Sequence, residues 1–232
     1  MGADPLINLH NHTTYSDGDF TVEQVVAAAE RGGLTHVAIT DHFETAKVHS
    51  LLSAQFERYL DEIRSAARRH PNVRVLAGVE IDTDPSRCDL DALPIELLNR
   101  LDVVLFEYVD DDGASLEALE PILSQLRPMR GLAHMDIERI YFGTEPDEVA
   151  SRFRDFDMFV EMNAALPYRR YGVPFYELAS KYYEAFRGRV RVSIGADAHH
   201  SLEAVVRLER PYRFARSAGL TDDLLFSDMQ SK

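Results

Sequence analysis

The chain has 232 residues, of which 45% are hydrophobic and 28% are charged. This composition excludes a disordered chain, a collagen and a coiled coil. The 39 acidic residues outnumber the 25 Lys and Arg residues, for a formal net charge of −14, which argues against general binding to nucleic acids or anionic membranes.

The length suits one domain that buries a large core. We expect a single domain over residues 1–232, with a core from about residue 6 to residue 220 and a polar C-terminal tail. Cys88 is the only cysteine, so no disulfide can form within the chain, as suits a reducing compartment. The sequence shows no basic leader and no long apolar run, and we therefore expect a cytoplasmic protein without a membrane partner. The oligomeric state is left open.

In chain order, seven short runs rich in Val, Ile and Leu alternate with longer segments of helical periodicity. We expect strands at residues 7–12, 36–40, 73–80, 103–108, 131–134, 158–161 and 190–195. A capping-box pattern at Thr21 predicts a helix that stops at Gly32. Further helices are expected at residues 51–69, 91–100, 116–126, 147–153, 174–186 and 202–210.

Strands that alternate with helices indicate parallel pairing, in either an open doubly wound sheet or a closed barrel. Periodicity does not distinguish these two folds, but the polar residues at the strand ends do. A barrel gathers the carboxyl ends of all its strands around one mouth, whereas an open sheet spreads them along an edge. The sequence therefore favours an α/β fold, a seven-stranded (β/α)7 TIM-like barrel.

Histidine and carboxylate residues recur at these strand ends. His10 and His12 are two residues apart in a strand, so both side chains lie on the same face. The later strand ends carry Asp41, His42, Glu80, Glu107, His134, Glu161, Asn163, Asp197 and His199. Helix capping explains single Asp residues, but not five histidines at such positions. Nitrogen and oxygen ligands without sulfur suit zinc, iron or manganese, so the sequence predicts two or three divalent metal ions.

These residues lie in motifs that resemble the PHP (polymerase and histidinol phosphatase) superfamily. The resemblance runs from Leu9 to His199 and rests on HNHT at 10–13, SDG at 16–18, TDH at 40–42, GVE at 78–80, AH at 133–134, EMN at 161–163 and GADAH at 195–199. It implies a single PHP domain folded as a distorted seven-stranded barrel with up to three metal ions.

Carried over by position, the resemblance implies three metal sites. One ion is expected on His10, His12, Glu80 and Asp197. Glu80 would bridge to a second ion that also takes His134, and a third ion would lie on Asp17, His42 and His199. The expected catalytic carboxylates are Glu80, Asp197 and Asp41. Outside the ligands, Asp41, Glu161 and Asn163 are expected to orient them, with loop capping an alternative role for Asp41.

The fourth strand departs from the family pattern, which places a metal-binding histidine there. The sequence instead has Glu107, with no histidine nearby. Glu107 is the expected substitute ligand and Asp110 the weaker alternative. An oxygen ligand would favour manganese or iron. If neither carboxylate reaches the site, the cluster holds two metals or is incomplete.

A metal cluster lowers the pKa of bound water and neutralises phosphate charge. We therefore expect a hydrolase, a metal-dependent phosphoesterase that acts through a metal-bridging hydroxide. The expected substrate is a small phosphate monoester, such as histidinol phosphate, a nucleotide or a sugar phosphate. Arg169 or Arg170 is expected to bind its phosphate through the forked guanidinium. The alternatives are a PHP-type nuclease, which needs a basic strip beside the site, and a catalytically degenerate binding or regulatory module.

Overall fold

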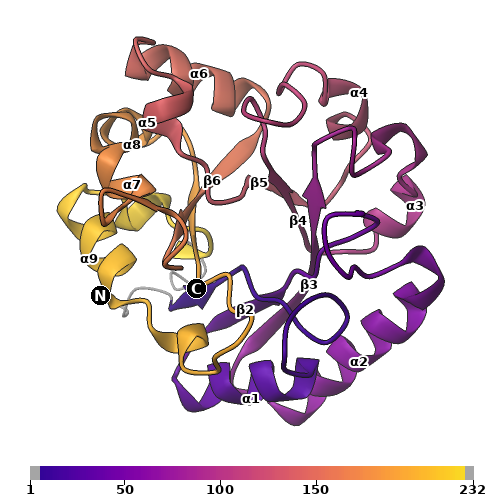
Figure 1. Cartoon of the computed structure of the whole chain (residues 1–232). Helices are drawn as coiled ribbons and strands as arrows, with labels where there is room; N and C mark the ends of the chain where they lie inside the picture. Colours follow the sequence, from indigo (N-terminus) through magenta and orange to yellow (C-terminus); the bar gives the residue numbers. More distant parts are fainter. Residues whose placement is uncertain (1–5, 228–232) are drawn as a thin grey trace.

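The computed structural model describes residues 6–227. Its main sheet has seven parallel strands in the order β1-β2-β3-β4-β5-β6-β9. Their bounds are β1 (Ile7–Asn8), β2 (His36–Ile39), β3 (Arg74–Asp82), β4 (Val103–Glu107), β5 (Met129–Leu132), β6 (Met158–Asn163) and β9 (Val192–Gly195). The sheet nearly closes on itself, because the amide of Leu9 donates to the carbonyl of Ile194 at 2.8 Å. The predicted seven-stranded barrel is confirmed (Figure 1).

Helices surround this barrel (Figure 1). They are α1 (Val22–Arg31), α2 (Phe56–Arg69), α3 (Ile95–Leu98), α4 (Glu120–Leu123), α5 (Ile137–Ile140), α6 (Pro146–Asp155), α7 (Phe175–Leu178), α8 (Ser180–Phe186) and α9 (Glu209–Ser217), with 3-10 turns at η1 (Ser53–Gln55), η2 (Leu90–Ala92), η3 (Ala204–Val206) and η4 (Thr221–Asp223). Thr21 and Gln24 form the predicted capping box of α1. The buried face of α1, which includes Val22, Val25 and Val26, packs into the core.

The prediction of a helix at residues 202–210 was wrong. Residues 204–206 form the 3-10 turn η3, and the α-helix α9 begins only at Glu209, near the end of the predicted range. Pro211 lies in the first turn of α9, where the backbone amides have no helical partner and a proline therefore fits. The proline thus signals the start of a helix.

The loop after β6 contains a small hairpin that the strand pattern did not predict. It pairs β7 (Arg169–Arg170) with β8 (Val173–Pro174) in antiparallel fashion. Its turn places Tyr171 at φ 56° and Gly172 at φ 76°, both in the left-handed region. Strands of two residues carry no detectable periodicity, so sequence reasoning missed them.

The first strand is shorter than predicted, because regular pairing ends at Asn8. The side chain oxygen of Asn8 accepts hydrogen bonds from the amides of His10 at 3.2 Å and Ala196 at 3.1 Å. The following residues run along the end of β9, where the amide of His12 donates to the carbonyl of Ala198 at 3.1 Å. The segment that carries His10 and His12 therefore lies at the closure of the barrel.

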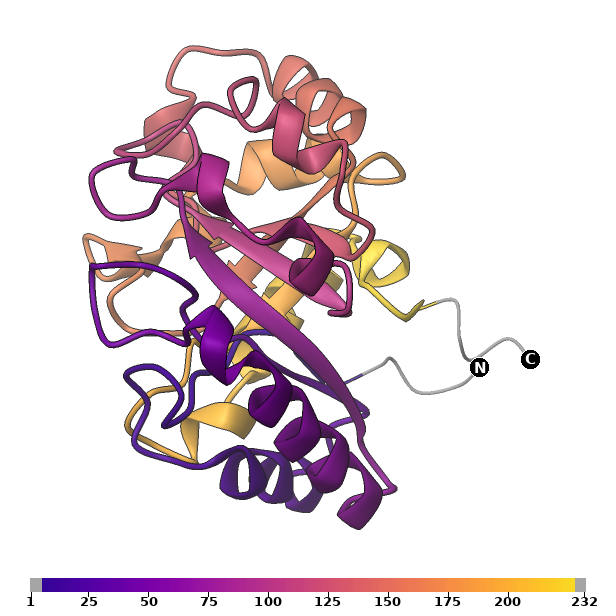
Figure 2. The ribbon, with the colours of Figure 1, turned by 90° about the vertical axis from the view of Figure 1, so that its right-hand side faces the viewer.

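The core lies between the strands and the helices around them. Tyr59 of α2 is fully buried there, and its hydroxyl donates to the carbonyls of Ile39 at 3.1 Å and Gly78 at 2.7 Å. This contact ties α2 to the end of β2 and the middle of β3. The loops that follow the strands extend from one end of the barrel (Figure 2). No helix in residues 6–227 is long and apolar enough to cross a membrane.

Candidate metal centre

The histidine and carboxylate side chains at the strand ends converge at the mouth of the barrel. Three sets have ligand atoms that all lie within 4.8 Å of one another: His10, His12, Glu80 and Asp197; His12, Asp17, His42 and His199; and His42, Glu80 and Glu107. The side chains of His10, His12, Glu80 and Glu107 are fully buried. Charged groups at such depth need a compensating charge or ligand.

The first set has the spacing of atoms around one ion. Nε2 of His10 lies 3.0 Å from Nε2 of His12 and 3.4 Å from Oε1 of Glu80. Oδ1 of Asp197 lies 3.0 Å from Nε2 of His12. Ligand atoms about 2.1 Å from a common ion stand roughly 3 to 3.5 Å apart. The geometry therefore fits a divalent ion.

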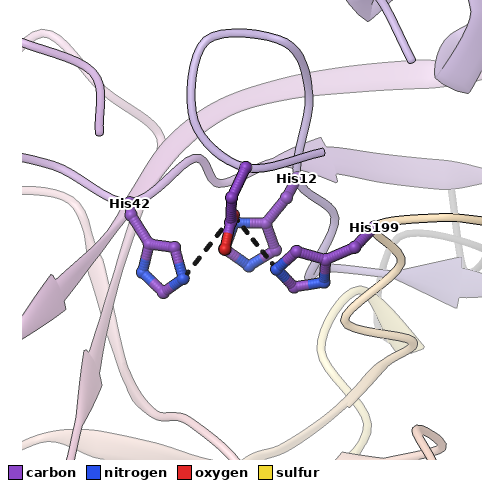
Figure 3. Close-up of side chains that lie close together, drawn as sticks. His12, His42 and His199 are labelled. Carbon is purple, nitrogen blue, oxygen red and sulfur yellow. Dashed lines mark ion pairs between the residues drawn. The ribbon is translucent and has the colours of Figure 1, made fainter. Parts of the chain in front are cut away.

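In the second set, the rings of His12, His42 and His199 surround one carboxylate group (Figure 3). This carboxylate is Asp17, whose Oδ1 lies 3.2 Å from Nε2 of His199 and 3.9 Å from Nε2 of His42. Oδ1 is buried and has no hydrogen-bond partner among the described residues. A β-carbon on the neighbouring Gly18 would lie 2.6 Å from the carbonyl oxygen of His12, so only glycine fits this turn.

In the third set, Nδ1 of His42 lies 3.1 Å from Oε2 of Glu80 and 3.5 Å from Oε1 of Glu107. These three atoms are also buried without hydrogen-bond partners in the described part of the chain. Burial raises the pKa of Glu107 to about 7, and the charge of Glu80 adds to this effect. Glu107, the residue predicted to replace a histidine, therefore has its carboxylate facing the cluster.

Lys47, which sequence reasoning missed, forms an ion pair with Glu107. Its Nζ donates to Oε2 of Glu107 at 2.7 Å and lies 4.9 Å from the centre of the Tyr108 ring. Lys47 stands in the loop after β2, outside every motif, so no local signal marks it.

Two residues of the centre have strained backbones. His134 has φ 34° and Asp197 has φ 46°, a region that side chains with a β-carbon seldom occupy. The amide of His134 donates to Oε2 of Glu161 at 2.8 Å, and the amide of Asp197 donates to the carbonyl of His10 at 2.9 Å. These hydrogen bonds hold the strained backbone in place. In this conformation Nε2 of His134 lies 2.9 Å from Oε1 of Glu80.

The residues expected to orient ligands differ in their contacts. Glu161 accepts from Nδ1 of His10 at 3.0 Å and from the side chain of Asn163 at 3.0 Å. Asp41 accepts from the amide of Thr13 at 2.7 Å and the hydroxyl of Ser16 at 2.6 Å. Glu161 therefore contacts the cluster directly, while the hydrogen bonds of Asp41 shape the loop that carries Asp17.

A cavity of about 630 Å³ opens beside the cluster and is lined by Asp197, His199, Tyr168, Arg169 and Arg207, among others. The ring of Tyr168 stacks on that of His134 with centroids 4.0 Å apart. Sequence reasoning did not identify Arg207, which stands outside the motifs.

Arg170 and Asp110 form ion pairs with residues outside the three ligand sets. Arg170 pairs with Asp136 at 3.1 Å and also with Glu138. Asp110 pairs with Arg152 at 2.6 Å. Of the two candidate arginines, the structure brings Arg169 to the cavity; of the two candidate carboxylates, it brings Glu107 to the cluster.

A buried cluster of nitrogen and oxygen ligands at the mouth of a TIM-like barrel is an arrangement typical of metal-dependent hydrolases. The model of the PHP domain matches residues 8–215. The chain belongs to the PHP domain family.

Solved structures share this fold. One is the histidinol phosphate phosphatase (HISK) of Lactococcus lactis subsp. lactis Il1403, complexed with zinc, L-histidinol and phosphate, at a TM-score of 0.63, 14% identity and coverage of 92% of this chain and 93% of that one. Another is the hisK protein of Listeria monocytogenes, at a TM-score of 0.58, 15% identity and coverage of 89% and 99%.

Among curated proteins, the DNA polymerase/3'-5' exonuclease PolX of Bacillus subtilis (strain 168) is 34% identical over 100 residues. The match includes 42% of this chain and spans 17% of the length of that relative.

Proposed function

We propose that this protein hydrolyses a small phosphate monoester with divalent metal ions bound at the barrel mouth. One observation carries the proposal. The cavity is lined by the cluster residues Asp197 and His199 and also by the cationic residue Arg169. A phosphate group can therefore contact the metal-binding wall and a guanidinium at the same time.

Two sets of side chains are the proposed metal ligands. His10, His12, Glu80 and Asp197 would hold one ion, and Asp17, His42 and His199 another. Bound ions would supply charge neutralisation and an acidified water at neutral pH. Zinc, iron and manganese all suit these donors, and a PHP-fold neighbour was solved with zinc.

The remaining residues have proposed roles in positioning. Glu161 holds the tautomer of His10 in which Nε2 faces the cluster. Arg169 binds a phosphate oxygen. Tyr168 covers His134 by stacking, which shields this part of the centre from water.

Turnover and metal content test this proposal together. We would measure metals by plasma mass spectrometry on protein purified without chelator, and hydrolysis of p-nitrophenyl phosphate with added manganese. Bound metal with turnover supports a phosphoesterase, and a panel with histidinol phosphate, nucleoside monophosphates and sugar phosphates would then rank substrates. Bound metal without turnover on any phosphate ester favours the degenerate binding module.

A nuclease is the second candidate function, because the PolX relative is named as a 3'-5' exonuclease. The net charge of −14 opposes association with a polyanion. Comparing bis-p-nitrophenyl phosphate and single-stranded DNA with monoesters distinguishes the two. Faster cleavage of the diesters would contradict the monoesterase proposal.

A further inference from the structure

We infer that Lys47 takes the place of a third metal ion, so that the centre binds two divalent ions and completes its positive charge with a lysine ammonium. This inference rests on the proposed function only in requiring that the cluster binds metal. In this view the ion pair of Lys47 with Glu107 is a permanent component of the metal centre.

The histidines limit the number of ions that the three sets can hold. A neutral imidazole has one nitrogen lone pair, because its other nitrogen carries a proton. Each histidine therefore serves one ion, although His12 and His42 belong to two sets each. If His12 serves the set with Asp197 and His42 serves the set with Asp17, the third set keeps only Glu80 and Glu107.

His134 lies beside these two carboxylates, so a third ion would have to bind Glu107 together with Glu80 and His134. Nε2 of His134 lies 2.9 Å from Oε1 of Glu80 and 3.9 Å from Oε2 of Glu107. Within residues 6–227, His134 belongs to none of the three sets of close ligand atoms. The oxygen of Glu107 that faces His134 is the one that accepts the hydrogen bond from Lys47 at 2.7 Å.

Lys47 is held firmly at this oxygen. Its backbone amide donates to Oγ1 of Thr45 at 3.1 Å, and the amide of the preceding Ala46 donates to the carbonyl of Arg87 at 2.8 Å. The ammonium also lies over the ring of Tyr108, a favourable contact for a cation. The loop therefore places a positive charge beside Glu107 before any ligand binds.

A metal ion on the same carboxylate would have to approach this ammonium. Two positive charges a few ångströms apart in a buried site repel strongly, and Glu107 would lose its hydrogen bond to make room. In the part of the chain that the structure describes, the carboxylates Asp197 and Asp17 of the other two sets form ion pairs with histidines and with no Lys or Arg. The sets that contain Asp197 and Asp17 are thus free to bind metal ions, whereas the charge of Glu107 is already neutralised by Lys47.

The test is the metal stoichiometry of four proteins, each loaded with excess manganese at pH 8, freed of unbound metal by gel filtration and measured by plasma mass spectrometry. We expect two ions in the wild type and two in Lys47→Arg, which keeps the charge. We expect three in Lys47→Met, which removes the charge at similar length. The double variant Lys47→Met/Glu107→Ala should return to two, because the added ion needs Glu107.

Anomalous scattering from manganese in crystals of the wild type provides a measurement that does not depend on any variant folding. Two peaks, with none between Glu107 and His134, support the inference. Three ions in the wild type, or two in Lys47→Met, would overturn it and leave the proposed phosphoesterase standing. No bound ion in any of the proteins would overturn both proposals.

Discussion

Glu161 and His10 are joined across the barrel closure, with Oε1 of the carboxylate 3.0 Å from Nδ1 of the imidazole. Both side chains are nearly or fully buried. A carboxylate accepts only, so in the neutral, metal-binding form of the imidazole Nδ1 carries the proton and the lone pair of Nε2 is left to face Glu80 and Asp197. Glu161 therefore sets the direction in which His10 can bind a metal.

The first prediction concerns this contact. Glu161→Gln keeps the shape of the side chain but removes the charge that fixes the His10 tautomer. We expect metal affinity to fall about 10- to 100-fold, as measured by competition with a coloured chelator. The control is Glu120→Gln in α4, an exposed residue far from the motifs. Equal metal affinity in Glu161→Gln and the wild type would refute the role of Glu161.

Gly195 at the end of β9 leaves space for this same pair. A β-carbon at this position would lie 1.8 Å from Oε1 of Glu161 and 2.6 Å from Cβ of His10. We expect Gly195→Ala to displace Glu161, to lower the free energy of unfolding by about 2 kcal/mol and to weaken metal binding.

Gly143→Ala is the matched control for this variant. Gly143 has φ 85°, and a β-carbon built on it would have no other atom within 4 Å, so its substitution strains the backbone without reaching the cluster. Denaturant unfolding and metal titration of both variants check the prediction. It fails if the two variants bind metal alike.

Asp197 contributes to the first ligand set and lines the cavity. We expect Asp197→Ala to reduce bound metal and to lower kcat for p-nitrophenyl phosphate by about three orders of magnitude, because several kcal/mol of charge stabilisation are lost. The fold should remain, as far-ultraviolet circular dichroism would show. Full activity in this variant would disprove the assignment of the cluster.

The two neighbouring arginines provide a paired comparison. Arg169 lines the cavity, whereas Arg170 is held by Asp136 and Glu138. Arg169→Ala should lower kcat/KM about 10- to 100-fold through lost charge-assisted hydrogen bonds, with metal content unchanged. Arg170→Ala should affect stability more than kcat/KM. The reverse ranking would place the phosphate near Arg170 instead.

His36 predicts a pH dependence of stability that is separate from the metal centre. Burial lowers the pKa of His36 to about 4, and the nearby charge of Arg74 adds to this effect. In the unfolded chain the pKa is about 6.5, so acid protonates the unfolded state first. The contribution of neutral His36 is present above pH 6.5 and is lost as the pH falls toward 4.

We expect this loss to reach about 1 kcal/mol by pH 5.5. The measurement is urea unfolding at pH 7.5 and 5.5 of the metal-free wild type and of His36→Phe, which retains the stacking on Phe226 seen at 4.2 Å. The variant should lose less stability on acidification than the wild type. Equal losses would show that His36 does not titrate as described.

The sequence by itself determined the barrel and the residues at its mouth. The alternation of apolar runs with helical segments is a local property, and strand polarity then carries His10, Glu80, His134 and Asp197 to one end. The helix expected at residues 202–210 was misplaced, although Pro211 lies in the first turn of α9 and a proline is a signal for the start of a helix.

Only the tertiary structure decided which side chains meet. Lys47 and Glu107 are 60 residues apart, and no periodicity connects a loop lysine with a strand carboxylate. Arg169 and Arg170 are adjacent in sequence and lie in the short strand β7 of the hairpin after β6. Arg169 lines the cavity, whereas Arg170 pairs with Asp136. The physical reason is that contacts at the mouth depend on loop conformation and barrel closure, which arise from the packing of the whole chain.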